Sequence, residues 1–158
     1  IIVIDDCSQK FKEENKSTCE LNDVKYIELA ENIGRSKIRN LFLEYVKFDY
    51  LLFLDCDSLV KNPLFLLNYV EIIKTSPSVV CGGRVYEEHL PPRSQMLSWK
   101  YGTRKESQPC EVRLKSPNKS FMTNNFMIQR TVLEAVKFDE RITKLGYQDT
   151  SSNLSERK

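Results

Sequence analysis

The chain has 158 residues, 41% of them hydrophobic and 29% charged, with a net charge of +2 at pH 7. This composition is typical of one soluble globular domain, and the small net charge by itself indicates no nucleic acid or other polyanionic partner. No apolar run reaches the ~18 residues of a membrane span, so we expect no transmembrane segment. The five scattered cysteines form no C-x-x-C pair, which favours reduced thiols in a cytoplasmic protein.

Two strand patterns and an amphipathic helix come first along the chain. Residues 1–4 form an apolar run that leads into two acids, and residues 24–29 alternate between apolar and polar side chains. Ser36 can cap a helix that continues to about Lys47, because apolar residues recur there at the spacing of one helix face. We therefore expect two strands and then a helix before residue 50.

The most informative stretch is residues 50–57, which read YLLFLDCD. The uninterrupted apolar run predicts a strand buried on both faces, and Asp55 and Asp57 follow where that strand leaves the sheet. In an open α/β sheet, ligands bind at the carboxyl ends of strands. Two acids there repel each other unless a cation offsets them, and Mg²⁺ or Mn²⁺ carrying a diphosphate suits such a pair. The alternative is a strand end followed by a turn that Asp57 and Ser58 cap.

A helix and a short strand follow this acidic pair. Residues 62–63 (Asn-Pro) predict the start of a helix that runs to about Lys74. Residues 78–81 form a short apolar strand that leads into Gly82 and Gly83. These elements continue the alternation of strands and helices that indicates an α/β domain with a largely parallel sheet.

Residues 84–119 show no clear periodicity. They contain four prolines and carry eight Lys or Arg against four Glu, a local net charge of +4. A long irregular segment inside a compact domain is usually functional or mobile. We expect this one to cover a donor diphosphate, to bind an acceptor or to be a solvated loop. A strand over residues 121–129 and a helix opened by a capping box at residues 131–134 follow.

Acids at two strand ends about 50 residues apart occur in several kinds of protein. The chain resembles a signalling receiver domain, in which such acids hold Mg²⁺ around a phosphorylated aspartate, here Asp55. A receiver also needs a Ser or Thr after its fourth strand and a Lys after its fifth, whereas residues 78–81 lead into two glycines. The chain also resembles the D-x-D-x-(T/V) motif of haloacid-dehalogenase phosphatases, but Leu59 stands at its last position.

The most extensive resemblance is to the family 2 glycosyltransferases. Residues 2–8 (IVIDDCS) are similar to that family's V-x-D-D-x-S element, residues 32–40 (NIGRSKIRN) to its N-x-G-x-x-x-x-R-N stretch, and residues 52–57 to its D-x-D. The acceptor-side half of that family is similar to three further stretches of this chain, residues 125–128, 138–140 and 146–149. Each motif is weak alone, but together they keep the family's order over nearly the whole chain.

This resemblance implies a GT-A fold, an α/β architecture of three layers around a mostly parallel central sheet, over residues 1–150, with a polar, unstructured tail at residues 151–158. It implies a glycosyltransferase of polysaccharide biosynthesis that uses a nucleotide sugar, a UDP-sugar above all, together with Mg²⁺ or Mn²⁺. The acceptor would be a hydroxyl of a glycan or a lipid-linked molecule. The lack of a Q-x-x-R-W element favours non-processive transfer, and we expect an inverting enzyme in the cytoplasm or at the inner face of a membrane.

The resemblance also implies roles for the acids. Asp57 is the expected direct metal ligand, and Asp55 is expected to contact the metal or the donor's ribose. Asp6 or Asp5 would hydrogen-bond the nucleotide base, a role that suits an acceptor at a strand end.

Further roles concern an arginine, two glycines and a second acidic stretch. Arg39 would face the nucleotide or brace the acids, with a solvated surface side chain as the alternative. Gly82 and Gly83 would let the backbone approach the sugar, unless they form a plain turn. Asp149 is the expected general base, although Gln148 replaces the family's Glu beside it and an Asx-turn is the alternative.

The chain also departs from the family at both ends. Family members begin with another strand and helix before the element at residues 2–8, and they continue beyond the acidic pair near residue 149. That first strand lies centrally in the sheet, and without it backbone groups are left unpaired. We therefore expect a fragment that is unstable or weakly active on its own.

Overall fold

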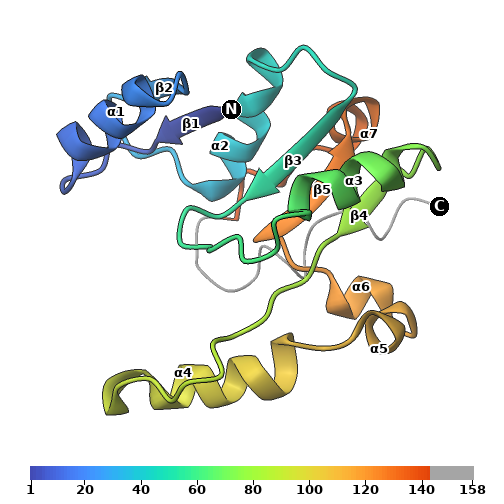
Figure 1. The fold of residues 1–158 in the computed structure, drawn as a ribbon. Helices are drawn as coiled ribbons and strands as arrows, with labels where there is room; N and C mark the ends of the chain where they lie inside the picture. Colours follow the sequence, from blue (N-terminus) through green and yellow to red (C-terminus); the bar gives the residue numbers. More distant parts are fainter. Residues whose placement is uncertain (143–158) are drawn as a thin grey trace.

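Two small β-sheets flanked by helices make up the computed structural model, which describes residues 1–142 (Figure 1). In the first sheet, β1 (Ile2–Asp5) and β2 (Lys25–Glu28) pair in parallel, and α1 (Lys12–Leu21) connects them. This is a short strand–helix–strand unit, and it places the two acids that follow the apolar part of β1 at the carboxyl edge of its sheet.

The second sheet is antiparallel. β5 (Asn125–Gln129) lies between β3 (Tyr50–Leu54) and β4 (Val79–Cys81) and runs opposite to both. Because β3 and β4 therefore point the same way, the D-x-D stretch and the two glycines both leave the sheet at the same edge. Within residues 1–142, β1 and β3 share no ladder of hydrogen bonds. The expected α/β class is confirmed, and one strand pair is parallel while two are antiparallel.

The remaining helical segments are short. They are α2 (Arg35–Leu41), the 3₁₀ turn Phe42–Glu44, α3 (Phe65–Ile73), the 3₁₀ turn Arg93–Gln95, α4 (Met96–Tyr101), the π-helical turn Gly102–Glu106, α5 (Cys110–Leu114), α6 (Pro117–Ser120) and α7 (Arg130–Val136). In the described residues no helix has the length and hydropathy needed to span a bilayer.

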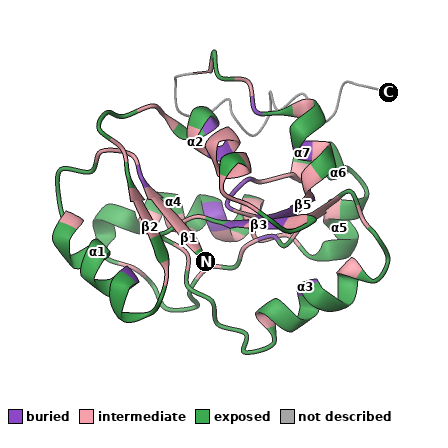
Figure 2. Cartoon of the chain, turned by 90° about the horizontal axis from the view of Figure 1, so that it is seen from above, coloured by how far each residue is buried: buried purple, intermediate pink, exposed green. Residues whose placement is uncertain are grey.

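β5 is the centre of the hydrophobic core (Figure 2). Phe126 and its two successors are almost fully buried, and Phe53 of β3 stacks on Phe126 with ring centroids 4.9 Å apart. The prediction that β3 is buried on both faces is wrong, since Leu51 and Phe53 are buried whereas Leu54 is exposed. An antiparallel strand commonly packs one face on the core, and this alternation is what β3 shows.

Two predicted helix starts are also wrong. α2 begins at Arg35 with Gly34 as its N-cap residue, and Ser36 is buried inside the helix rather than capping it. α7 begins at Arg130, whose side chain forms an ion pair with Glu134, and no side chain caps it. In both places a local sequence signal yields to contacts made elsewhere in the fold.

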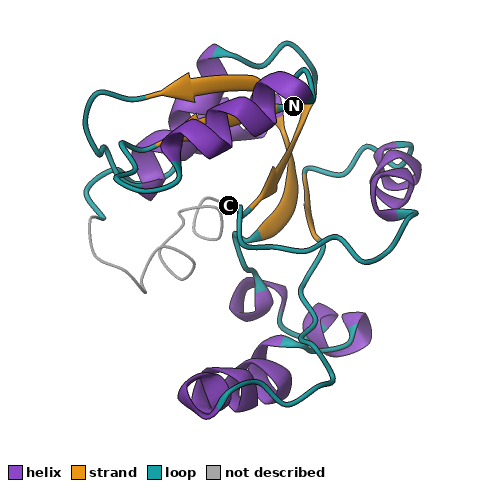
Figure 3. Ribbon diagram, turned by 60° about the vertical axis from the view of Figure 1, so that its left-hand side comes forward, coloured by secondary structure: helices purple, strands orange, loops and turns teal. Residues whose placement is uncertain are grey.

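Residues 84–119 form an arm that projects away from the antiparallel sheet (Figures 1 and 3). The expectation of a wholly irregular segment is wrong, because α4, α5, α6 and the π-helical turn lie within it. Each of these segments has six residues or fewer. Runs that short cannot display the repeat by which an amphipathic helix is recognised in a sequence.

Candidate functional site

The D-x-D stretch forms a tight turn where β3 ends. The Asp55 backbone N–H donates to the Asn124 carbonyl at 2.9 Å, and the Ser58 N–H donates to the Asp55 carbonyl at 3.0 Å. This turn leaves Cys56 and Asp57 exposed. Within residues 1–142 the Asp57 carboxylate has no hydrogen-bond or ion-pair partner, so its oxygens face solvent. The fold thus presents one open carboxylate at the carboxyl edge of the sheet.

The other carboxylate of the motif is braced by a buried arginine. Arg39 Nη2 lies 3.4 Å from Asp55 Oδ1 and also donates to the Thr123 carbonyl at 3.3 Å. The guanidinium carbon is 5.4 Å from the centre of the Phe138 ring. Arg39 is only 6% exposed, so the alternative of a solvated surface side chain is wrong. Of the two roles expected for it, the structure shows the bracing of Asp55.

Asp6 holds two parts of the chain together. Its Oδ1 accepts from the Ile33 N–H at 2.6 Å and its Oδ2 from the Gly34 N–H at 2.9 Å. Asn32 adds a hydrogen bond from its side-chain amide to the Asp6 carbonyl. These donors lie at the start of α2, where a negative charge is also favoured by the helix dipole. Asp6 therefore fixes the loop that leads into the helix that carries Arg39.

Asp5 is buried and fully engaged. Its Oδ1 accepts from the Ser8 N–H and its Oδ2 from the Tyr26 hydroxyl, both at 2.6 Å. Burial alone raises the pKa of the Asp5 carboxyl, but the hydrogen bonds from Tyr26 and Ser8 outweigh it and leave that pKa below its ordinary value. The same hydrogen bond to Asp5 raises the pKa of Tyr26 above its usual range. Protein groups thus occupy both oxygens of Asp5, as they do those of Asp6.

Asn40 links α2 to the segment after α7. Its side-chain amide donates to the Phe138 carbonyl at 2.9 Å, and its Oδ1 accepts from the Phe138 N–H at 2.8 Å. The amide also reaches Glu140 Oε1 at 2.9 Å. Residues 32–40 therefore tie together the ends of β1 and β3 and the chain beyond α7.

The two glycines after β4 have protein neighbours. A Cβ on Gly82 would collide with the Tyr69 hydroxyl, which donates to Asn125 Oδ1 at 2.6 Å. Gly83 has a φ of +74°, and a Cβ there would lie 3.0 Å from the Arg113 guanidinium. Burial raises the pKa of Tyr69 to about 12, so its hydroxyl remains a donor. The structure thus supplies a packing reason for both glycines, and the predicted approach to a sugar stays a prediction.

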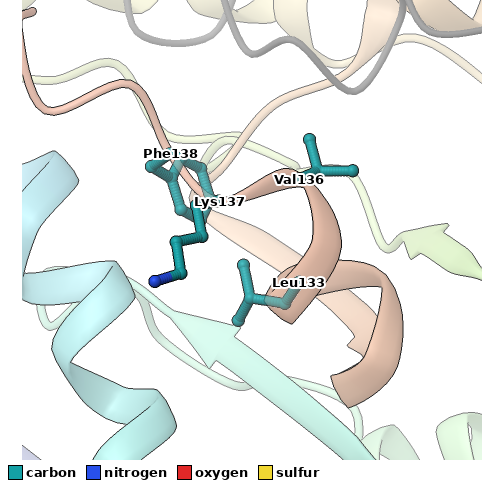
Figure 4. Close-up of a pocket in the computed structure, with 4 residues that line it drawn as sticks. All are labelled: Leu133, Val136, Lys137 and Phe138. Carbon is teal, nitrogen blue, oxygen red and sulfur yellow. The ribbon is translucent and has the colours of Figure 1, made fainter.

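The remaining expected site residues lie elsewhere. Asp149 and Gln148 are outside the described residues. A shallow hollow at the end of α7 is lined by Leu133, Val136, Lys137 and Phe138 (Figure 4). None of these four is an expected site residue, and only Phe138 connects the hollow to the acids, through Arg39.

The open acids fit a divalent cation that substrate phosphates also ligate. Residues 1–142 contain no cluster of three or more His, Cys, Asp or Glu side chains that could hold a metal alone. Mg²⁺ commonly takes one or two protein carboxylates and fills its other positions with water and phosphate oxygens. Asp57 is open, and Asp55 Oδ2 accepts no hydrogen bond from the described residues, so these two oxygen donors suit such an ion.

Sequence reasoning missed three positions that shape this site. Tyr26 holds Asp5, Asn40 holds the segment at Phe138, and Asn124 supports the turn at Asp55. Asn124 is 8% exposed, and its Oδ1 accepts no hydrogen bond within the described residues. Asn40 ends the N-x-G-x-x-x-x-R-N stretch, a signal that names no partner, whereas Tyr26 and Asn124 are marked only by polarity beside apolar strand residues.

Comparison with known proteins identifies the family. Residues 1–137 match the family described as Glycosyl transferase family 2. The chain belongs to glycosyl transferase family 2. The receiver interpretation lacks this support, and it also expects the parallel doubly wound sheet of such domains, whereas β5 is antiparallel to both of its neighbours.

One curated relative of this family 2 chain is the hyaluronan synthase of Pasteurella multocida. The two are 32% identical over an alignment of 103 residues, which covers 59% of this chain and 10% of that protein. The chain therefore spans about a tenth of the length of the curated relative that it matches.

Solved structures show that the fold is GT-A. S. aureus TarS residues 1–349 in complex with UDP has a TM-score of 0.64 at 18% identity, over 94% of this chain and 43% of that one. The mannosyltransferase PcManGT of Pyrobaculum calidifontis, in complex with GDP-Man and Mn²⁺, has a TM-score of 0.61 at 15% identity, over 94% and 40%. At these identities the likeness concerns the fold, and the expected GT-A architecture is confirmed.

Proposed function

We propose that this chain binds a nucleotide-diphosphate sugar with a divalent cation and transfers the sugar to a hydroxyl acceptor. The observation that carries the proposal is the open Asp57 beside the Arg39-braced Asp55 at the carboxyl edge of the sheet. Family membership supports it, as do similar structures that hold UDP in one case and GDP-Man with Mn²⁺ in another. A UDP-sugar remains our preferred donor.

The chemistry explains why the site needs these groups. Breaking the bond between the anomeric carbon and the diphosphate places negative charge on the leaving group. A bound Mg²⁺ or Mn²⁺ neutralises that charge, and Asp57 with Asp55 Oδ2 would hold it. Arg39 fixes the orientation of Asp55 through Oδ1, which leaves the other oxygen free to point away. Asp6 serves the same site by holding the loop before α2, Asp5 is held by Tyr26 and Ser8, and either acid can still contact the base through a remaining lone pair.

The acceptor half of the proposal rests on the resemblance. An attacking hydroxyl must lose its proton as the new bond forms, and Asp149 in the GYQD stretch is our candidate base. Direct attack from the face opposite the leaving group makes the transfer inverting. We further propose a non-processive enzyme of polysaccharide biosynthesis, placed in the cytoplasm or at the inner face of a membrane, with a glycan or lipid-linked acceptor.

Titration calorimetry with UDP and Mn²⁺ tests donor binding. We expect UDP to bind only when Mn²⁺ is present, and Asp57→Asn to weaken that binding at least about tenfold, because loss of one carboxylate ligand weakens a divalent site strongly. Asp23→Asn, which removes an exposed acid from the turn after α1, is the matched control and should leave binding unchanged. Release of UDP from a panel of UDP-sugars then identifies the donor.

Two outcomes contradict the proposal. One is UDP binding that is indifferent to Mn²⁺ and to Asp57→Asn. The other is labelling of Asp55 by acetyl phosphate without any affinity for UDP, which would favour a receiver domain.

A further inference from the structure

The arm, residues 84–119, is anchored beside the proposed donor site. Lys61, in the loop after the D-x-D turn, forms an ion pair with Glu87 of the arm at 2.8 Å. At the arm's other half, Arg113 donates to the Cys81 carbonyl at the end of β4, at 3.0 Å. The arm therefore leaves and rejoins the fold at the same sheet edge as Asp57, although it projects away from the sheet (Figure 3).

Internal contacts hold the first half of the arm in one shape. The Tyr86 ring lies against Gly102, where any Cβ would collide with it. Trp99 Nε1 donates to the Glu87 carbonyl at 2.7 Å. Arg84 pairs with Glu106 at 2.9 Å, and the Tyr86 hydroxyl donates a short hydrogen bond to the same carboxylate. These contacts fix which side of α4 and the π-helical turn faces inward.

Two acids of the arm's first half, Glu87 and Glu106, are paired, whereas Glu88 and four of the cations form no ion pair within the described residues. Burial raises the pKa of Glu106, but the hydrogen bonds from Tyr86 and Arg84 outweigh it and lower that pKa overall, so the acid stays charged and paired. Glu87 is paired with Lys61. Within residues 1–142, no ion pair involves the four exposed cations Arg93, Lys100, Arg104 and Lys105.

These four cations are exposed. Through α4 and the π-helical turn, positions 97, 101 and 105 follow one another at intervals of four and positions 100 and 104 form the neighbouring row, while Arg93 lies in the 3₁₀ turn just before α4. Two residues at these positions carry no charge and are also exposed, Leu97 at 82% and Tyr101 at 61%. We call this set the outer face; it comprises Arg93, Leu97, Lys100, Tyr101, Arg104 and Lys105.

We propose that the outer face binds an anionic glycan, the acceptor of the proposed sugar transfer. The role of this glycan as the acceptor rests on the proposed function, whereas the binding of the glycan to the outer face does not. Four unpaired cations complement carboxylate or sulfate groups spaced along a polymer, and the arginines can engage them through two hydrogen bonds each. The exposed Tyr101 ring offers a flat apolar surface to the C–H side of a sugar ring.

A membrane surface is the competing partner for a basic amphipathic face. Interfacial helices bury a broad apolar side among the lipids. The outer face has only Leu97 and Tyr101 for that purpose, against four cations. The ion pair of Glu87 with Lys61 also ties the arm to the loop after the D-x-D turn, the region where an acceptor must arrive. Both points favour the glycan.

Binding of a hexamer of oligogalacturonate, compared with its methyl ester, tests the proposal on the full chain. The two probes share length and shape and differ only in charge. We expect the acid to bind at least about fivefold more tightly than the ester, and its affinity to fall as salt is raised, because exposed ion pairs are screened. The double variant Lys100→Gln/Arg104→Gln should lose at least about fivefold in affinity for the acid. Tyr101→Ala should weaken both probes.

A matched control separates a site from bulk charge. Lys10→Gln/Lys16→Gln removes two exposed cations, one just before α1 and one within it, in the unit that contains the other sheet. The affinity for the acid should stay within about twofold, since screened charges act over about 10 Å. Equal binding of acid and ester, or equal losses in both double variants, overturns the proposal. Arm-dependent binding to phosphatidylserine vesicles without binding to oligogalacturonate overturns it in favour of a membrane surface.

The same variants keep this inference apart from the proposed function. UDP and Mn²⁺ binding should be unchanged in Lys100→Gln/Arg104→Gln, because neither residue contacts the D-x-D turn. If the chain binds UDP but ignores the acidic hexamer, this inference alone fails. If it binds the hexamer but no UDP, the glycan site stands and the proposed transfer fails.

Discussion

Two acidic pairs lie at strand ends in this chain, and the structure places them in opposite environments. After the apolar part of β1, all four carboxylate oxygens of Asp5 and Asp6 accept hydrogen bonds from protein donors. After β3, Asp55 has one oxygen on Arg39, and Asp57 has no partner in the described residues. The residue type and its position at the sheet edge are the same. What differs is the number of donors that the fold supplies.

The two environments give the two acidic pairs different roles. A carboxylate saturated by backbone N–H groups stabilises the fold, because its burial is offset by charge-assisted hydrogen bonds. A carboxylate left open has little effect on stability and is free to bind a cation. Within the first pair, Asp6 holds the loop before α2, and α2 carries the Arg39 that braces Asp55 of the second pair. Removing acids one at a time measures this division directly.

The largest expected effect on stability is that of Asp6→Ala. It removes two hydrogen bonds to a charged acceptor, each worth ~1.5 kcal/mol or more, and leaves two N–H groups without that partner. We expect the free energy of unfolding to fall by about 2–4 kcal/mol. Chemical denaturation monitored by circular dichroism measures it. An unchanged midpoint would mean that Asp6 does not stabilise the loop before α2 and would return it to the candidates for direct nucleotide contact.

Part of this arrangement could be predicted from the sequence. Apolar runs located β1, β3 and β4 to within about a residue or two, because strands leave a local signature. The exposed turn at Asp55 and Asp57 also followed from a strand that ends in charges. The glycosyltransferase family rested on the order of several weak motifs, and it is confirmed.

The rest depended on contacts between distant positions. Ser36 has the residue type of a helix cap, but no side chain caps α2, and Asp6, 30 positions earlier, holds the loop before the helix instead. Asn40 pairs with Phe138 across almost a hundred residues. The arm's helices are too short to show a period, and contacts such as Tyr86 on Gly102 hold them in place. Local patterns carry no record of such partners.

Tyr26→Phe should have a smaller effect, with a signature in pH. It removes one hydrogen bond to Asp5, for a loss of about 1–2 kcal/mol at neutral pH. The folded-state pKa of Asp5 lies below its ordinary value of 3.8, so its contribution is complete above that value and is lost as the pH falls through the folded-state pKa. Without the Tyr26 hydrogen bond, one of the causes that lower the pKa of Asp5 is lost and that pKa rises.

Acid titration of the folded protein checks this shift. The variant should begin to lose stability at a higher pH than the parent, because Asp5 then takes up its proton sooner. Tyr50→Phe is the matched control, since Tyr50 is also half-buried and its hydroxyl forms no hydrogen bond within residues 1–142. Superimposable acid unfolding curves for Tyr26→Phe and the parent would show that the hydrogen bond does not set the pKa of Asp5.

The smallest effect on stability should come from Asp57→Asn, the variant expected to damage ion binding most. Asp57 is exposed and has no partner in the described residues. The free energy of unfolding of the variant without metal should therefore stay within about 0.5 kcal/mol of the parent's. Any change should be a gain, since the substitution removes a like charge two positions from Asp55. Thermal unfolding with and without Mn²⁺ and UDP compares the two proteins. The ligands should stabilise the parent, because they bind only the folded state, and should not stabilise the variant. A variant that is destabilised by more than about 1 kcal/mol without ligand would place Asp57 with Asp5 and Asp6 as a structural acid, and the opposition between the two pairs would fail.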